Sequence, residues 1–252
     1  MTYIDCHFHF ADKYFYKRVD ELVKDWLKLD INKIVTVATN LKESHRNIEL
    51  TKKYPNIIFA GIGRHPWGAH KFSEEELFIC KGLAQKQEVS IIGEVGLDHY
   101  FIKDKDRWKR QVTVLEQFIQ MANHNKKSLM LHLTGAEEEI YQILTSSKLE
   151  VNFCCHWYSG STKILKKLSD LGSYFTVNPA FLRSKKHKKV LELVDKPYLL
   201  TESDGPVKFK GEPGTPVLIP MLCEVIAKEI KIPIEELNTI MQTNFLKYIK
   251  NQ

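Results

Sequence analysis

Short apolar runs alternate with longer amphipathic segments along the whole chain. Each run is six to eight residues long and rich in Ile, Val, Leu and Phe. Runs of this length, bounded by polar residues, are typical of buried strands. We therefore predict eight strands, at residues 3–10, 33–39, 57–63, 89–96, 128–133, 151–157, 173–178 and 197–204.

The segments between these runs carry apolar residues at helical spacing. In VDELVKDWLKLD, Val19, Val23 and Trp26 share one face of a helix. Ser73 stands three residues before Glu76, which fits a capping box at a helix start. Helices are predicted at residues 19–30, 42–54, 73–86 and 106–125, between the later strands, and twice in 217–250, the second from near Ile234.

Strand and helix alternate almost strictly, with no linker, repeat or low-complexity block between them. This alternation favours a parallel sheet, and eight units favour closure into a (β/α)₈ TIM barrel. An open doubly wound sheet is the alternative, but no predicted strand is followed by GxGxxG or a Walker loop. We predict one barrel domain over residues 1–252.

The composition of the chain excludes several classes of protein but does not identify a function. The chain is 43% hydrophobic and 27% charged, with a net charge of +6 that is compatible with a polyanionic partner. Its five cysteines include no CxxC pair, so a disulfide framework or thiolate zinc site is not indicated. Neither a basic-then-apolar leader nor a run of membrane-spanning length is found. We expect a cytoplasmic protein with reduced thiols and no membrane association.

Ionisable residues gather where the predicted strands end, while the strand starts are apolar. In such barrels the active site lies at the C-terminal ends of the strands. Converging imidazoles and carboxylates at this rim favour a metal site over unrelated core histidines. The residues concerned are His7, His9, His65, Glu94, Asp98, His132, His156, Glu202 and Asp204.

His7 and His9 show why the spacing matters. Side chains at i and i+2 of a strand point to the same face. Two protonated imidazoles there would repel each other, whereas two neutral ones make good ligands for one cation. Taken alone, the pair is also compatible with one core histidine and one that is hydrogen-bonded.

These residues lie in short blocks that resemble a known family. DCHFH, GRHPW, GEVGLD, the histidine of LMLH, HWYSGS and TESDGP resemble, in order, the signature blocks of the TatD family of metal-dependent deoxyribonucleases, which are amidohydrolase-type barrels. The blocks span residues 5–206. SYFTVNPAFLRS followed by LLTESDGP is similar to a subgroup, the TatD-like QatD components of four-gene Qat anti-phage defence systems. Membership of that subgroup would imply other Qat proteins as partners.

The resemblance implies two divalent cations, Zn, Mn or Mg. His7, His9, Glu94 and Asp204 would hold one, and Glu94, His132 and His156 the second, with Glu94 bridging them. A bridging carboxylate suits cations about 3.5–4 Å apart, the spacing used for in-line phosphoryl displacement, with a water of lowered pKa as the nucleophile. Asp204 is the candidate general base; an N-cap or turn residue before Gly205 is its alternative.

Substrate contacts are implied less directly. By likeness to the family, His65 would contact the scissile phosphate, although a turn histidine is an alternative. Trp157 and Tyr158 would stack a base or sugar or simply pack, and Asn178 would support a ligand or touch substrate. The basic run SKKHKK at 184–189 reads as a solvated helix face or as a phosphate-steering patch.

The substrate surroundings depart from the family pattern. Thr134 stands where many members carry an Arg, and Phe10 and Ala11 replace the usual acidic residue after HxH. We therefore keep three functions open: a nucleic acid phosphodiesterase, acting from an end; a hydrolase of a small phosphoester, lactone or amide; and a defence-complex subunit with secondary catalysis. Filled ligand positions count against an inactive site.

Overall fold

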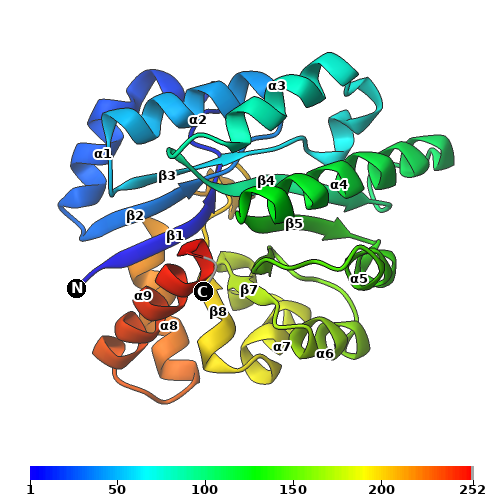
Figure 1. The fold of residues 1–252 in the computed structure, drawn as a ribbon. Helices are drawn as coiled ribbons and strands as arrows, with labels where there is room; N and C mark the ends of the chain where they lie inside the picture. The colour runs from blue at the N-terminus through cyan, green and yellow to red at the C-terminus, as the bar shows by residue number, and fades with distance from the viewer. Residues whose placement is uncertain (251–252) are drawn as a thin grey trace.

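Eight parallel strands form one sheet in the order of the sequence (Figure 1). The structure is a computed structural model that describes residues 1–250. The sheet confirms the predicted barrel, although several strands are shorter than the apolar runs. The strands are β1 (Tyr3–Phe8), β2 (Ile31–Thr36), β3 (Ile58–Ile62), β4 (Val89–Asp98), β5 (Ser128–Thr134), β6 (Phe153–Cys155), β7 (Tyr174–Val177) and β8 (Leu199–Thr201).

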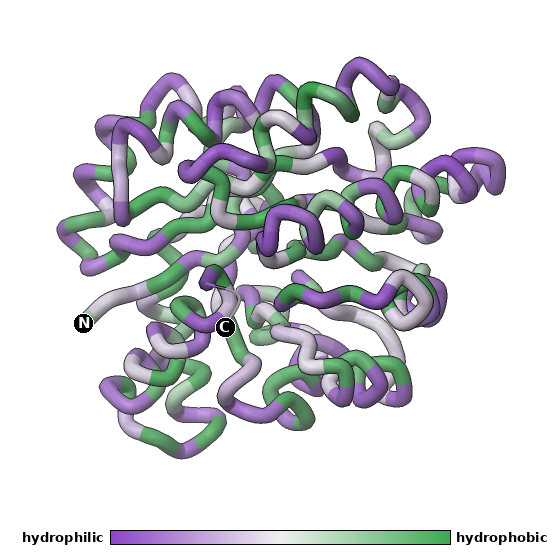
Figure 2. The backbone as a smooth tube through the Cα atoms, in the orientation of Figure 1, coloured by the Kyte–Doolittle hydropathy of each residue, from purple (hydrophilic) through white to green (hydrophobic). Residues whose placement is uncertain are grey.

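Helices surround this sheet, one or more after each strand (Figure 1). They follow the predicted positions because apolar residues at helical spacing must face the sheet. Figure 2 shows the result, with hydrophobic positions concentrated on the strands and mixed with hydrophilic ones along the helices. The helices are α1 (Val19–Leu27), α2 (Leu41–Lys53), α3 (Glu74–Ala84), α4 (Lys105–Asn125), α5 (Glu137–Ser146), α6 (Thr162–Asp170), α7 (Lys185–Leu193), α8 (Leu218–Glu229) and α9 (Ile234–Lys250).

The first and last strands lie side by side and nearly close the barrel. Thr201 Oγ1 donates to Ile4 O at 2.6 Å. Beyond the strands, the backbone N–H of Asp204 donates to His7 O at 3.0 Å, and that of His9 to Gly205 O at 3.1 Å. Hydrogen bonds therefore run along this seam up to the rim where the ionisable residues lie.

The barrel interior is packed with apolar side chains and closed at one end. One buried cluster draws residues from every strand except β3, including Ile4, Ile91, Met130 and Leu200, and the partly buried Phe59 of β3 packs against it. The cluster also contains Tyr248 of α9, whose hydroxyl donates to Leu129 O at 3.0 Å. Because α9 closes the end where the strands begin, only the opposite end is left for polar chemistry.

The structure differs from the predicted elements just before and just after β8. The run at 197–204 contains Pro197, which lacks an N–H, and its first residues form a 3₁₀ turn, η4 (Lys196–Tyr198). A small hairpin of β9 (Lys208–Phe209) and β10 (Glu212–Pro213) was not predicted. Within residues 1–250, no helix combines the length and apolar character needed to cross a lipid bilayer.

Candidate metal centre

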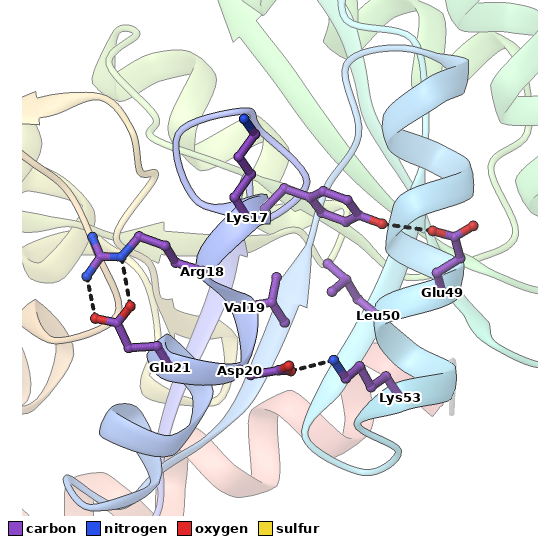
Figure 3. A pocket seen from close by; sticks show the side chains of 9 residues that line it. Lys17, Arg18, Val19, Asp20, Glu21, Glu49, Leu50 and Lys53 are labelled. Atoms are coloured by element: carbon purple, nitrogen blue, oxygen red, sulfur yellow. Dashed lines mark hydrogen bonds and ion pairs between the residues drawn. The ribbon is translucent and has the colours of Figure 1, made fainter.

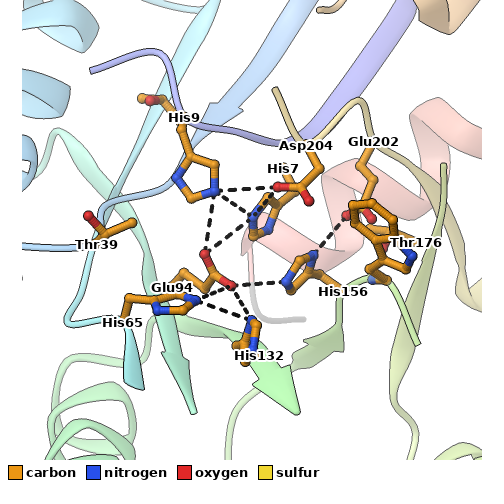
Figure 4. Close-up of polar contacts among 12 residues, drawn as sticks. His7, His9, Thr39, His65, Glu94, His132, His156, Thr176, Glu202 and Asp204 are labelled. Atoms are coloured by element: carbon orange, nitrogen blue, oxygen red, sulfur yellow. Dashed lines mark hydrogen bonds and ion pairs between the residues drawn. The ribbon is translucent and has the colours of Figure 1, made fainter. Parts of the chain in front are cut away.

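The ionisable residues predicted at the strand ends come together in one buried cluster (Figure 4). They reach it from six different strands or the loops directly after them. Glu94 of β4 lies at the centre of the cluster, and its two carboxylate oxygens face two different groups of side chains. The cluster therefore divides naturally into two donor sets that share one residue.

The first donor set is formed by His7, His9, Glu94 and Asp204. The Nε2 atoms of His7 and His9 are 3.4 Å apart, and each lies 3.4 Å from Asp204 Oδ1. Each also lies 3.5 Å from Glu94 Oε2. Donor atoms about 2.1 Å from a tetrahedrally bound ion lie about 3.4 Å from one another. The spacing of these four atoms thus fits a single divalent cation.

The second donor set is built on the other oxygen of Glu94. Oε1 lies 2.9 Å from His132 Nδ1 and 2.9 Å from His156 Nε2. His65 Nε2 is also close, 3.5 Å from this oxygen and 3.3 Å from His132 Nδ1. Two or three nitrogens and one carboxylate oxygen therefore surround a second position, next to the first.

A carboxylate that faces one nitrogen of each imidazole leaves the other nitrogen to point into the second set. His132 Nε2 lies 3.1 Å from Asp98 Oδ2, so that nitrogen carries the proton and Nδ1 keeps its lone pair. His156 Nδ1 faces Glu202 at 3.5 Å, which leaves Nε2 for the set. These are the carboxylate–histidine pairs that orient ligands in metal sites.

His65 has the opposite arrangement. The backbone N–H of Trp67 donates to His65 Nδ1 at 3.2 Å. Burial lowers the pKa of His65 to about 3, so the ring is neutral and carries its proton on Nε2. An N–H there is a donor rather than a lone pair. His65 thus matches a contact to a phosphate oxygen better than a bond to a cation.

Glu94 and Asp98 are anionic in this cluster. Burial raises the pKa of Glu94, but the imidazoles of His65, His156 and His7 outweigh it and hold that pKa well below its usual range. Burial likewise opposes ionisation of Asp98, yet hydrogen bonds from His132 and the Phe101 N–H lower its pKa to about 2. Anionic oxygens beside imidazole nitrogens are a donor set suited to Zn²⁺ or Mn²⁺.

Several buried polar atoms of the cluster lack a hydrogen-bond partner within residues 1–250. Among them is Glu94 Oε2, which faces the first donor set. A buried anionic oxygen without a hydrogen bond is costly, and a cation bonded to it would remove that cost. The residues present therefore fit the divalent cations that the sequence predicts.

Irregular backbone aims the ligands into the rim. The pairing register shifts in β1 between Asp5 and Phe8, and in β4 between Ile92 and Val95. Such irregularities redirect side chains, here those of His7 and Glu94. Asp204 has φ 47, a left-handed conformation that is uncommon outside glycine but least so for Asp and Asn.

The structure places the other predicted residues around this cluster. Asn178 Nδ2 donates to Glu202 Oε1 at 2.9 Å and so supports the carboxylate behind His156. Trp157 stacks on Phe209 of the hairpin at 5.4 Å and donates its indole N–H to His187 of α7. Tyr158 is buried, and its hydroxyl donates to Ser161 O at 2.8 Å.

Two residues with clear structural roles were not singled out from the sequence. Asp5 is fully buried and accepts the backbone N–H groups of His7 and Ser203, which ties β1 to the loop after β8. Its position two residues before His7 is the signal that would have identified it. Trp67 donates its indole N–H to Asp98 Oδ2 at 2.6 Å. That contact depends on a loop conformation and has no counterpart in the sequence pattern.

A hollow of about 490 Å³ lies elsewhere, between α1 and α2 (Figure 3). Most of its charged side chains are paired: Asp20 with Lys53, and Arg18 with Glu21. Tyr16 donates its hydroxyl to Glu49 Oε2 at 2.8 Å. Since these charges are already satisfied at the surface, the hollow offers little to an ionic substrate.

Comparisons with known proteins agree with this geometry. A family model described as TatD related DNase matches residues 4–250. MJ1582 of Methanocaldococcus jannaschii, described as an uncharacterized metal-dependent hydrolase, is 32% identical over 256 residues, covering all of this chain and 98% of that protein. The deoxyribonuclease TATDN3 of Homo sapiens is 23% identical over 259 residues, 97% of this chain and 93% of that protein.

A solved structure has the same fold. The crystal structure of YjjV, a TatD homologue of Escherichia coli, matches with a TM-score of 0.90 at 23% sequence identity, over 99% of this chain and 97% of that one. The likeness extends over the whole barrel, including the rim on which the cluster lies.

Proposed function

This chain belongs to the TatD family of metal-dependent hydrolases, and from that membership we propose that it cleaves phosphodiester bonds in DNA or another nucleic acid. The observation that carries the proposal is the position of Glu94 between two donor sets. A carboxylate shared in this way suits a pair of cations on the two sides of a scissile phosphate. The net charge of +6 is compatible with a polyanionic substrate.

The proposed ligands are those that the sequence predicts. His7, His9, Glu94 and Asp204 would hold one cation, and Glu94, His132 and His156 would hold the other. When bound, Zn²⁺, Mn²⁺ or Mg²⁺ supplies an attacking water of lowered pKa and neutralises charge on the phosphate.

Asp204 and His65 act on the substrate side in this proposal. Asp204 uses Oδ1 in the first donor set, so its Oδ2 is left to accept the proton of the attacking water. His65 presents an Nε2–H at the edge of the second set, where it donates to an oxygen of the scissile phosphate. Both side chains are buried, which limits competing bulk water.

Trp157 is the remaining proposed substrate contact. It is half-buried and its ring is held by Phe209 and His187, so a flat apolar face is already positioned near His156. We leave Tyr158 out of the proposed contacts because its ring is buried and its hydroxyl is used. Asn178 supports Glu202 and therefore acts through His156.

The test compares cleavage of labelled single- and double-stranded oligonucleotides with Mn²⁺, Mg²⁺ or Zn²⁺. The wild-type protein should give a ladder of products that Glu94→Gln loses by at least about 100-fold, because both donor sets share that residue. Glu116→Gln, on the exposed face of α4, is the matched control. Turnover of small phosphoesters, lactones or amides without any nucleic acid cleavage would replace this proposal by the small-molecule one.

A role in anti-phage defence is a finer proposal. It is supported by the resemblance of residues 173–184 and 199–206 to the QatD components, and it implies other Qat proteins as partners. We also propose that the chain acts as one unit in the cytoplasm, where its five buried, unpaired cysteines stay reduced. Phage protection that is lost in Glu94→Gln would support a catalytic role in defence; protection unchanged in that variant would favour assembly over catalysis.

A further inference from the structure

Three large aromatic side chains stand exposed beside the second donor set. Trp67 is 49% exposed, and Tyr100 and Phe101 are each 61% exposed. They come from two loops, the one after β3 and the one after β4, and we call them the aromatic ledge. Single exposed aromatics are ordinary, but a contiguous group at the rim of a catalytic barrel is typical of a binding surface.

The Phe101 ring contacts both of the others. The Trp67 and Phe101 ring centroids are 5.7 Å apart at 72°, and those of Tyr100 and Phe101 are 4.8 Å apart at 87°. These edge-to-face contacts hold the rings in fixed relative positions while their outer faces remain in solvent. The ledge is therefore ordered before any ligand arrives, which lowers the entropic cost of binding.

One carboxylate, that of Asp98, holds the ledge in place. Its Oδ2 accepts the indole N–H of Trp67 at 2.6 Å. Its Oδ1 accepts the backbone N–H of Tyr100 at 3.0 Å and that of Phe101 at 2.7 Å. Asp98 also accepts from His132 Nε2 at 3.1 Å. Asp98 thus connects the ledge, through three hydrogen bonds, to His132 of the second donor set.

Two cations lie at the ledge. Lys103 Nζ lies over the Tyr100 ring, 5.1 Å from its centroid. Arg107 Nη2 donates to Trp67 O at 2.7 Å, which holds its guanidinium against the same loop. Apolar rings for stacking beside positive charges for a phosphate backbone are the combination found in proteins that bind single-stranded nucleic acid.

Resting on the proposed function, we infer that the aromatic ledge stacks an unpaired base of the nucleic acid substrate, next to the scissile phosphate. Bases in a duplex are already stacked on one another and cannot reach a ring. The ledge therefore selects single-stranded nucleic acid or a frayed end. Every base has an aromatic face, so the selection is for unpaired bases rather than for sequence.

Phe101→Ala and Tyr100→Ala test the inference without disturbing the metal centre. Both variants remove an exposed ring and keep the backbone N–H that Asp98 accepts. Phe78→Ala, on α3 and 78% exposed, removes a similar ring that is not part of the ledge and is the matched control. Because all three side chains are exposed, the variants should unfold at the wild-type temperature.

The substrates are single-stranded oligonucleotides with normal bases, the same strands with abasic positions near the cleaved end, and blunt duplexes. For the normal strands, each ledge variant should raise KM about 5- to 150-fold, the range for loss of one stacked base, with kcat within about twofold of wild type. For abasic strands the variants and the wild type should have the same KM. Equal KM values for the wild type and for the variant that combines Tyr100→Ala with Phe101→Ala would overturn the inference. An equal rise in KM for normal and abasic strands would also overturn it.

Binding separates failure of this inference from failure of the proposed function. Anisotropy of a labelled single strand is measured with Glu94→Gln, alone and combined with Phe101→Ala. If binding depends on the ledge but the wild-type protein cleaves no oligonucleotide, the proposed phosphodiesterase function is refuted and the inference about the aromatic ledge stands. Cleavage that does not depend on the ledge would refute only the ledge. Loss of binding to a protein partner with oligonucleotide binding unchanged would assign the ledge to that partner and also overturn the inference.

Discussion

Replacing Glu94 with Gln should abolish the stabilisation of the fold by divalent cations. Glu94 contributes one oxygen to each donor set, 3.5 Å from two imidazole nitrogens in the first and 2.9 Å from two in the second. A glutamine keeps the shape but has only one carbonyl oxygen. Its –NH₂ group must face one of the two sets, where it offers protons instead of a lone pair.

The size of the effect follows from linkage. A cation at about 100 times its Kd stabilises the folded state by about 2.7 kcal/mol per site. For a chain of this length that corresponds to a rise in Tm of about 5–11 °C. If the substitution weakens binding about 100-fold, the same concentration gives only about 0.4 kcal/mol, or about 1–2 °C.

The assay is thermal unfolding of chelator-treated protein with and without Mn²⁺ or Zn²⁺, so each variant is its own reference. Glu116→Gln should keep the full wild-type shift, because that carboxylate lies on the exposed face of α4. A full shift in Glu94→Gln, or no shift in the wild type with either cation, would refute the two-set description. Activity is not needed for this conclusion.

Three further outcomes are expected. Asp98→Asn weakens the acceptor for His132 Nε2, so Mn²⁺ affinity measured by calorimetry should fall about 10- to 100-fold; an unchanged affinity would show that Asp98 does not orient the ligand. Trp26→Ala leaves a cavity against Phe8 and Phe10 and should cost about 3–5 kcal/mol in urea unfolding, and a loss below about 1 kcal/mol would contradict that packing. Burial raises the pKa of all five cysteine thiols, so a disulfide exchange reagent should label them only after denaturation. Rapid labelling of two or more in the folded protein would contradict this.

The barrel was predictable because its strands are buried on both faces. Parallel strands in this setting become continuous apolar runs, and the helices between them show a different period. The strand ends were less predictable. Cys155 ends β6, although the apolar run continues to Trp157, because Trp157 takes a left-handed conformation with φ 41. Nothing in the residue pattern indicates that turn.

The gathering of the ionisable residues at one rim was predictable for a different reason. In a closed barrel every strand end reaches the same rim, so ligands distant in sequence meet once the strand order is known. The proton position on His65 was not predictable, since it depends on the N–H of Trp67 in a loop. The hydrogen bond from Trp67 to Asp98 was not predicted either, because it also depends on the conformation of that loop. Periodicity describes strands and helices but carries no information about loop conformation.

Because the first donor set spans the seam between β1 and β8, it can be completed only later in synthesis than the second. Thr201 and Ile4, which join across that seam, are separated by 197 positions in the chain. His7 therefore leaves the ribosome long before Asp204 exists, whereas Glu94, His132 and His156 are all present once the middle of the polypeptide has emerged. A cation held by His7 and Asp204 can be captured only after the last strand has joined the first. Loading of that position would therefore report that the two ends of the sheet had joined.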